Sequence, residues 1–264
     1  MKTDRRRALI FGALAADAVL GVTLAAVFHH VWIAFAVFFP AHLWLLCEIL
    51  SPYSTGLGPL VTRFDTRERE VWLTIDDGPA PEETPRLLEL LDRHGAKATF
   101  FVIGERAAKN PDLVRRLLEA GHTLGNHTAT HPQAWFWALT KNRLRSEIEG
   151  WFDRVESATQ QGWVRDHTLL FRSPVGMKPP GLHPVLSEFG LKLIGWSARG
   201  RDGVDHCDVG AALARIVKNI APGAIVVIHE SRGHAPELLE RLLDWLSREG
   251  YRCVLPGETR AEAR

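Results

Sequence analysis

The chain has 264 residues, of which 46% are hydrophobic and 24% are charged, a composition typical of one folded domain with an extra apolar segment. Its 32 lysines and arginines nearly balance its 31 aspartates and glutamates, so the net charge of +1 argues against a nucleic-acid partner. The cysteines Cys47, Cys207 and Cys253 are odd in number and far apart, which argues against a disulfide framework and a cysteine zinc site.

Residues 1–50 are predicted to form a membrane anchor. A basic head containing Arg5, Arg6 and Arg7 precedes an apolar run over residues 8–28, and a second run covers residues 31–50. Two transmembrane helices joined at His29-His30 fit this pattern best; one span followed by a membrane-surface helix and a cleaved signal peptide are the alternatives. Basic residues lie before the first run and after the second, at Arg63, Arg67 and Arg69, while the connection carries only histidines. The positive-inside rule therefore places the rest of the chain on the cytoplasmic side of a bacterial-type plasma membrane.

A linker is expected over residues 51–64, an α/β domain over residues 65–255 and a frayed tail over residues 256–264. Within the domain, strands are expected at residues 71–75, 98–103, 123–125, 168–171, 192–196, 224–228 and 251–254. Helices are expected from near Pro81 to Gly95, through Val114 to Gly121, over residues 142–157 and 184–188, after Asp208, and over residues 236–248. This alternation indicates a parallel sheet, either doubly wound or closed into a barrel.

Two adjacent carboxylates end the first expected strand. The run that begins at Val71 ends in Asp76-Asp77, and a Gly-Pro turn follows at once. The carboxyl ends of parallel strands open onto the crevice where ligands bind, and neighbouring strand residues point to opposite sides. One acid could therefore hold a metal ion while the other stays free as a base. The alternative interpretation is a polar turn that only ends the strand.

His127 and His131 stand four residues apart in the sequence His-Thr-Ala-Thr-His. On a helical turn this spacing would put both rings on one face, close enough to share a metal ion. Two histidines and one carboxylate form a facial triad with open positions, which suits zinc or another divalent ion. The pair alone is weak evidence, because a capping or core role is the more frequent one.

Three further polar groups follow expected strands. Arg172 could fix and stabilise a carboxylate that must remain ionised. Asp202 lies shortly after the strand that ends at Trp196, where a solvated charge cluster is the alternative. His229 ends a buried strand and suits a general acid at neutral pH. Together these groups predict a catalytic site at the carboxyl ends of several strands.

The order of these motifs resembles the NodB-homology polysaccharide deacetylases, carbohydrate esterase family four. TIDDGP is similar to the first family motif, HTATH matches the second, and FRSPVG, WSARGRDG and IVVIHE are similar to the remaining three. The resemblance covers about residues 68–255. It implies a distorted (β/α) barrel with about seven parallel strands, here preceded by the N-terminal transmembrane helices.

The resemblance also implies a role for each matching residue. The metal ligands would be Asp77, His127 and His131, and the cofactor a divalent metal: Zn²⁺ first, with Co²⁺, Ni²⁺ or Mn²⁺ as alternatives. The catalytic residues would be the base Asp76, oriented by Arg172, and the acid His229, tuned by Asp202.

Two positions depart from the family pattern. Val175 replaces a tyrosine but keeps a main-chain N–H for an oxyanion, and Gly203 replaces a tryptophan that usually shapes the acyl pocket. The preferred sugar and acyl group therefore stay open. The residues expected to bind substrate are Pro174, Val175, Trp196 and Val227, and Trp135 and Trp137 are further candidates for stacking on a sugar ring.

The sequence thus predicts a membrane-anchored, metal-dependent hydrolase that removes an N-acetyl group from an amino sugar in a glycan or a lipid-linked glycan. The alternatives are a deformylase of a lipid-linked amino sugar, an inactive carbohydrate-binding module and a metal-dependent phosphohydrolase, the last weakened by the lack of a phosphate-binding cluster. The expected partners are the glycan or glycolipid and the membrane; the sequence gives no oligomeric state.

Overall fold

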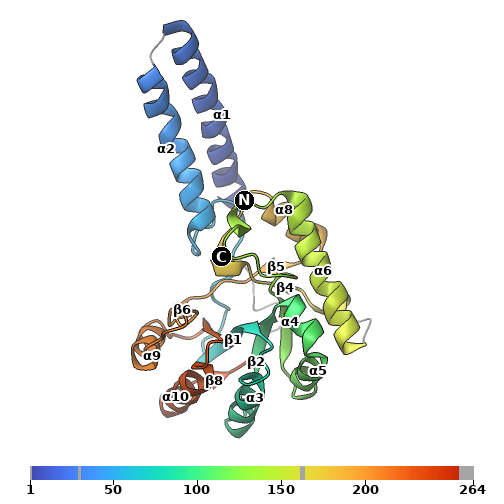
Figure 1. Ribbon diagram of the computed structural model, residues 1–264. Coiled ribbons are helices and arrows are strands. Elements are labelled where there is room, and N and C mark those ends of the chain that lie inside the picture. Colours follow the sequence, from blue (N-terminus) through green and yellow to red (C-terminus); the bar gives the residue numbers. More distant parts are fainter. Residues whose placement is uncertain (1, 29–30, 161–163, 256–264) are drawn as a thin grey trace.

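The computed structural model describes residues 2–28, 31–160 and 164–255. Its first two helices, α1 (Lys2–Phe28) and α2 (Val31–Leu50), lie side by side as an antiparallel hairpin that projects from the rest of the molecule (Figure 1). Residues Arg5–Leu24 of α1 are long and apolar enough to span a membrane. The predicted connection at His29-His30 and the predicted tail at 256–264 lie outside the described residues.

The rest of the chain is built on a curled parallel sheet. Its strands are β1 (Glu70–Gly78), β2 (Ala98–Val102), β3 (Thr123–Asn126), β4 (Leu170–Phe171), β5 (Lys192–Leu193), β6 (Ala198–Arg199), β7 (Ala224–His229) and β8 (Arg252–Cys253). Seven lie in the order β5-β4-β3-β2-β1-β7-β6, and β8 pairs with the start of β1. The predicted distorted barrel of about seven parallel strands is confirmed, and the sheet curls into a half-barrel (Figure 1). Strand β6 was not predicted, because its two residues lie in a polar stretch.

Helices cover the outer side of this sheet (Figure 1). They are α3 (Thr84–Arg93), α4 (Gly104–Lys109), α5 (Pro111–Glu119), α6 (Lys141–Thr159), α7 (Val164–His167), α8 (Leu182–Glu188), α9 (Val209–Val217) and α10 (Ala235–Arg248). Two 3₁₀ turns, η1 (Phe136–Ala138) and η2 (Pro174–Gly176), lie in the loops after β3 and β4. The helix expected to end at Gly121 is preceded by a separate short helix, α4, because Pro111 begins α5 afresh.

The alternation of β1 decides which side chains enter the barrel. Val71, Leu73 and Ile75 belong to the core between sheet and helices, whereas Trp72 belongs to a separate inner core with Phe101. Since successive strand residues point to opposite faces, Asp76 follows Trp72 toward the barrel interior. Burial of both faces explains why β1 reads as a nearly continuous apolar run.

Residues 61–64, at the end of the expected linker, pair with the open side of the sheet. Val61 forms a parallel bridge with Ile194, just beyond β5, and Arg63 forms an antiparallel bridge with Ala224 at the start of β7. Phe64 joins the inner core. The chain that leaves the helical hairpin is therefore part of the barrel wall, which fixes the hairpin close to the loops that follow β4 and β5.

Candidate active site

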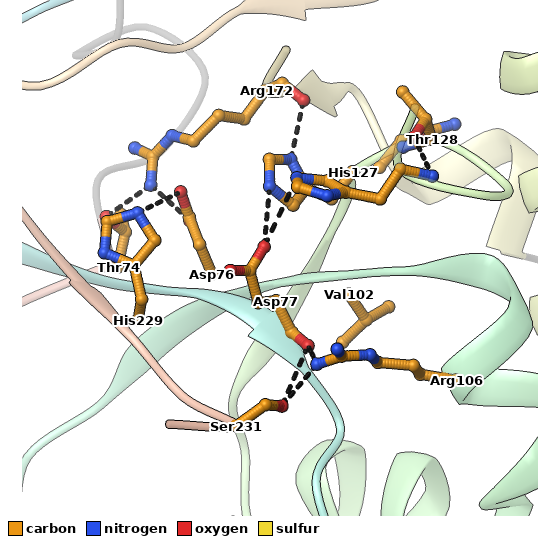
Figure 2. A network of polar contacts seen from close by, with 12 residues as sticks. Thr74, Asp76, Asp77, Val102, Arg106, His127, Thr128, Arg172, His229 and Ser231 are labelled. Carbon is orange, nitrogen blue, oxygen red and sulfur yellow. Dashed lines mark hydrogen bonds and ion pairs between the residues drawn. The ribbon is translucent and has the colours of Figure 1, made fainter. Parts of the chain in front are cut away.

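A cleft of about 320 Å³ lies at the carboxyl ends of the strands, where the predicted groups converge. Its deeper wall is formed by Asp76 and Asp77 from β1, His127 and His131 from the loop after β3, and His229 from β7. Figure 2 shows the two aspartates between His127 on one side and His229 on the other. Its outer wall is formed by Gln133, Ser173, Val175, Trp196, Arg199, Arg201, Gly203, Val204 and Arg232.

The side chains of Asp77, His127 and His131 meet at one point. Oδ1 of Asp77 lies 3.4 Å from Nε2 of His127 and 3.4 Å from Nε2 of His131. One potential ligand atom from each residue lies within 4.8 Å of the other two. The Nδ1 atom of His127 is 2.8 Å from the carbonyl oxygen of Arg172, which favours the tautomer that leaves Nε2 free as an acceptor.

These residues fit a divalent cation. Oδ1 of Asp77 is buried and accepts no hydrogen bond from any residue in the described part of the chain, although two imidazole nitrogens face it. Burial and the neighbouring His127 lower the pKa of His131 to about 3, so its ring is neutral at physiological pH, as a ligand must be. Two nitrogens and one carboxylate oxygen suit zinc and similar metals.

The expectation that His127 and His131 share a helical turn was wrong. The segment is an irregular loop in which Thr128 and His131 have φ values of 68° and 55°. Side chains replace helical hydrogen bonds: Asn126 accepts from the N–H of Thr128, and Thr128 accepts from the N–H of His131. Such local bonds compete with helix formation. The rings still converge, with centroids 4.7 Å apart.

Asp76 forms a buried ion pair with Arg172 beside this cluster. Nη1 of Arg172 donates to Oδ1 of Asp76 at 2.6 Å and to Oγ1 of Thr74 at 2.7 Å. The guanidinium also donates to the carbonyl oxygens of Ile194 and Gly195 and lies over the Phe101 ring, with 4.1 Å between Cζ and the ring centroid. These contacts hold Asp76 in one orientation and leave its Oδ2 facing the cleft.

His229 stands on the opposite side of Asp76 (Figure 2), with Nε2 4.0 Å from Oδ2 of Asp76. Its Nδ1 lies 3.3 Å from Oδ2 of the buried Asp202, off the line of a good hydrogen bond, so their attraction is mainly electrostatic. Burial lowers the pKa of His229, but Asp202, Asp76 and Asp77 outweigh that effect and raise it to about 9. The imidazole is therefore protonated at neutral pH.

The residues expected to bind substrate are distributed unevenly. Val175, with φ of 56°, and Trp196 line the cleft. Pro174 is buried beside it, and Val227 is fully buried in β7; neither is among the lining residues. Gly203 also lines the cleft, and a Cβ atom there would lie 3.3 Å from Cγ of His229. The backbone of Gly203 therefore packs closely against the His229 ring, and a larger residue at this position would crowd the imidazole.

Trp135 and Trp137 do not line the cleft, although both are partly exposed, at 67% and 38%. They lie at the η1 turn that follows His131. Neither of them makes a ring contact within the described residues, so their role in stacking on a sugar stays a prediction.

Arg106, near the start of α4, was not identified from the sequence. Nη1 of Arg106 donates to the main-chain oxygen of Asp77 at 2.5 Å and to the hydroxyl of Ser231 (Figure 2). Asp77 and Ser231 both have positive φ values, 70° and 72°, so one side chain ties together two strained loops. No motif distinguishes Arg106 from other helix arginines, and only the fold brings it to the site.

Comparisons with known proteins agree with this geometry. Residues 63–194, half of the chain, match the family model described as polysaccharide deacetylase. A peptidoglycan-N-acetylglucosamine deacetylase of Bacillus cereus is 34% identical over 72% of this chain and 88% of its own length. A chitooligosaccharide deacetylase of a Bradyrhizobium species is 34% identical over 69% of this chain and 78% of its own length.

Among solved structures, a carbohydrate esterase family 4 pseudoenzyme from Bacillus anthracis superposes with a TM-score of 0.66. It is 28% identical, over 75% of this chain and 68% of that one. The family model, the sequence relatives and the shared fold lead to one conclusion: this chain belongs to the polysaccharide deacetylase family, carbohydrate esterase family 4.

Proposed function

We propose that the protein is a metal-dependent N-deacetylase of an N-acetylated amino sugar within a glycan. The observation that carries the proposal is the convergence of Asp77, His127 and His131 on one point, with Asp76 and His229 on the adjoining walls of the same cleft. Ligands, base and acid are all present, and the relatives are named for the same reaction on peptidoglycan and chitooligosaccharide.

Asp77, His127 and His131 would hold the cation, which when bound lowers the pKa of water and polarises the amide carbonyl. Asp76 accepts the proton of the attacking water, while Arg172 keeps the carboxylate aimed at the cleft. His229 is already protonated at neutral pH and donates its Nε2 proton to the departing amine, with Asp202 stabilising the imidazolium. Acetate and the free amino sugar are the products.

The N–H of Val175 is the proposed donor to the oxyanion, because Val175 stands on the wall of the cleft in a strained backbone conformation. Trp196 would border the sugar.

The experiment uses the full chain in detergent, with N-acetylglucosamine oligomers and glycolipid extracts as substrates. Release of free amine and acetate should be abolished by a chelator and restored by zinc, cobalt, nickel or manganese. Metal analysis of the isolated protein identifies the metal that it binds.

Asp76→Asn should lower turnover by about 10³-fold or more while metal content stays the same. Arg116→Gln, on the exposed side of α5, is the matched control. Full turnover in His127→Ala would contradict the metal assignment.

A second candidate is a carbohydrate-binding module without turnover. The resemblance to a family pseudoenzyme and the loss of the motif-four tryptophan at Gly203 favour it. Sugar binding without release of acetate or formate in the same assay would support this candidate. Release of formate from a formylated glycolipid, with N-acetyl substrates untouched, would instead identify a deformylase.

The α1–α2 hairpin is proposed as a plasma-membrane anchor that leaves the barrel on the cytoplasmic side. Arg6 at the start of α1 and Arg63 after α2 lie at the barrel end of the hairpin, where the positive-inside rule places the cytoplasm. Alkaline phosphatase and green fluorescent protein fused to the C-terminus report the two faces. Phosphatase activity without fluorescence would contradict the cytoplasmic placement.

A further inference from the structure

Three arginines line the mouth of the cleft: Arg199, Arg201 and Arg232. The family resemblance assigns a role to none of them. Arg199 ends β6, Arg201 lies in the loop between β6 and α9, and Arg232 lies in the loop between β7 and α10. Arg199 is half-buried, and its guanidinium lies between two aromatic rings, 5.6 Å from the centroid of Trp196 and 5.7 Å from that of Tyr53. Stacking of this kind pre-orients a guanidinium for a ligand.

Nearby carboxylates balance only part of the positive charge of these three arginines. Arg232 pairs with Asp205 at 2.5 Å, whereas Arg199 and Arg201 form no ion pair within the described residues. The carboxylates deeper in the cleft face groups other than these arginines: Asp76 pairs with Arg172, Asp202 faces His229, and Asp77 faces His127 and His131. A neutral N-acetylated sugar carries no charge that could pair with these arginines. An anionic group close to the reacting sugar would neutralise it.

The mouth also lies beside the end of the helical hairpin. The Tyr53 ring that contacts Arg199 follows α2 by three residues. Pro52 packs against the loop of Val175, because a Cβ atom on Gly176 would meet Pro52 at 2.7 Å. The main chain and ammonium group of Lys178 donate to the carbonyl oxygens of Ile49 and Ser51. These contacts place the outer wall of the cleft where a membrane-spanning hairpin would leave the bilayer.

From these observations we infer that the substrate is an N-acetylated amino sugar joined through phosphate to a membrane lipid, and that Arg199, Arg201 and Arg232 bind that phosphate. The inference rests on the proposed deacetylase activity and adds its substrate class. A planar guanidinium donates paired hydrogen bonds to phosphate oxygens, and two or three of them match a phosphate or diphosphate better than a single carboxylate. The bilayer would present the lipid at the same level as Tyr53.

The test compares three substrates with the full chain reconstituted in vesicles. They are N-acetylglucosamine linked by diphosphate to a polyprenol, N-acetylglucosamine 1-phosphate in solution, and a neutral alkyl N-acetylglucosaminide. We expect kcat/KM to be highest for the polyprenyl substrate. Arg201→Gln should lower that value by about tenfold to a hundredfold and change the value for the neutral glycoside by less than about twofold. Arg201→Lys should recover part of the loss.

Arg201 is the variant of choice because its side chain is exposed and its removal leaves no buried partner unpaired. Arg116→Gln, on the outer helix α5, should leave all three substrates unaffected. Equal losses for the charged and neutral substrates, or no preference for the polyprenyl compound over the neutral one, would overturn the inference. Equal turnover of the soluble sugar phosphate would overturn its lipid part.

Failure of the proposed deacetylation would look different. In that case no substrate yields free amine, and retention of radiolabelled polyprenyl diphosphate sugar on the protein replaces the kinetic measurement. Binding that is weakened in Arg201→Gln and unchanged in Arg116→Gln would support the phosphate site without catalysis. Binding that is equal in both variants would refute it.

Discussion

Oδ2 of Asp202 accepts the main-chain N–H of His229 at 2.6 Å and faces Nδ1 of the same residue at 3.3 Å. One carboxylate oxygen thus fixes both the backbone and the charge of the imidazole. Asp202 has no exposed surface, so its charge acts on His229 with little screening by water. The proton that the proposed reaction delivers to the amine depends on this contact.

Asp202→Asn should therefore shift the pH dependence of turnover. Asp202 raises the pKa of His229, which is about 9 in the folded protein, and the acid is active only while protonated. Activity falls as the pH rises through that pKa, so removing the negative charge should move the alkaline limb of kcat to lower pH by about one unit or more. Profiles of kcat against pH, together with titration of the His229 ring by NMR, give the measurement. Asp153→Asn on α6 is the control, and an unmoved alkaline limb would contradict the assignment.

Arg106 should act as a positioning residue for Asp77, the proposed metal ligand. Its guanidinium holds the main-chain oxygen of Asp77 and the hydroxyl of Ser231, but it does not line the cleft. Arg106→Met keeps the length of the side chain and removes both bonds, so Asp77 loses its fixed orientation. We expect weaker metal binding and a fall of about tenfold in kcat with little change in KM. Arg106→Lys should recover part of the metal affinity, whereas unchanged metal affinity in Arg106→Met would exclude this role.

Glu230 should make the folded protein less stable as the pH rises. Burial raises its pKa to about 8 from 4.5, and the hydrogen bonds from Thr84 and Ala80 only partly oppose this shift. Between about pH 4.5 and pH 8, Glu230 therefore keeps its proton in the folded protein and loses it in the unfolded chain. By linkage, stability decreases with rising pH across that window, by an amount on the order of a few kcal/mol.

The Glu230→Gln variant tests this directly, because glutamine cannot ionise. Thermal unfolding of the full chain in detergent, followed at pH 5 and pH 8, should show a smaller loss of stability for the variant than for the wild type. The exposed Glu89→Gln on α3 should behave as the wild type does. Parallel curves for Glu230→Gln and the wild type would show that Glu230 is ionised throughout.

Much of the site could be predicted from the sequence, because the carboxyl ends of parallel strands lie at the same edge of the sheet. Asp76, Asp77 and His229 each follow a buried apolar run, and the shared edge of the sheet brings such groups together whatever lies between them. The two-residue period of β1 also predicted that the adjacent acids would face different partners. Asp76 indeed faces Arg172, while Asp77 faces His127.

The remaining features depend on contacts that no local pattern encodes. The turn that brings His131 beside Asp77 uses two left-handed residues and side-chain acceptors on Asn126 and Thr128, where the spacing alone indicated a helix. The segment containing Val61 closes the barrel through single bridges to partners more than 100 residues away. Arg199 and Arg201 carry no signal of their own in the sequence, because only the fold brings them to the mouth of the cleft with Arg232.

Lys178 should link the α1–α2 hairpin to the wall of the cleft that contains Val175. Its ammonium group is 1% exposed and donates to the carbonyl oxygens of Ser51 and Gly176, so it joins the end of α2 to the loop of Val175. Lys178→Met would leave both acceptors without this donor, at a cost of about 1–3 kcal/mol for each one that stays buried. We expect a lower melting temperature and a lower kcat with unchanged metal content, since the ligands lie on other loops. Lys109→Met, exposed on α4, is the control. If the hairpin were held to the barrel only by the chain between them, Lys178→Met would alter neither quantity, and the cleft would have no fixed position relative to the hairpin.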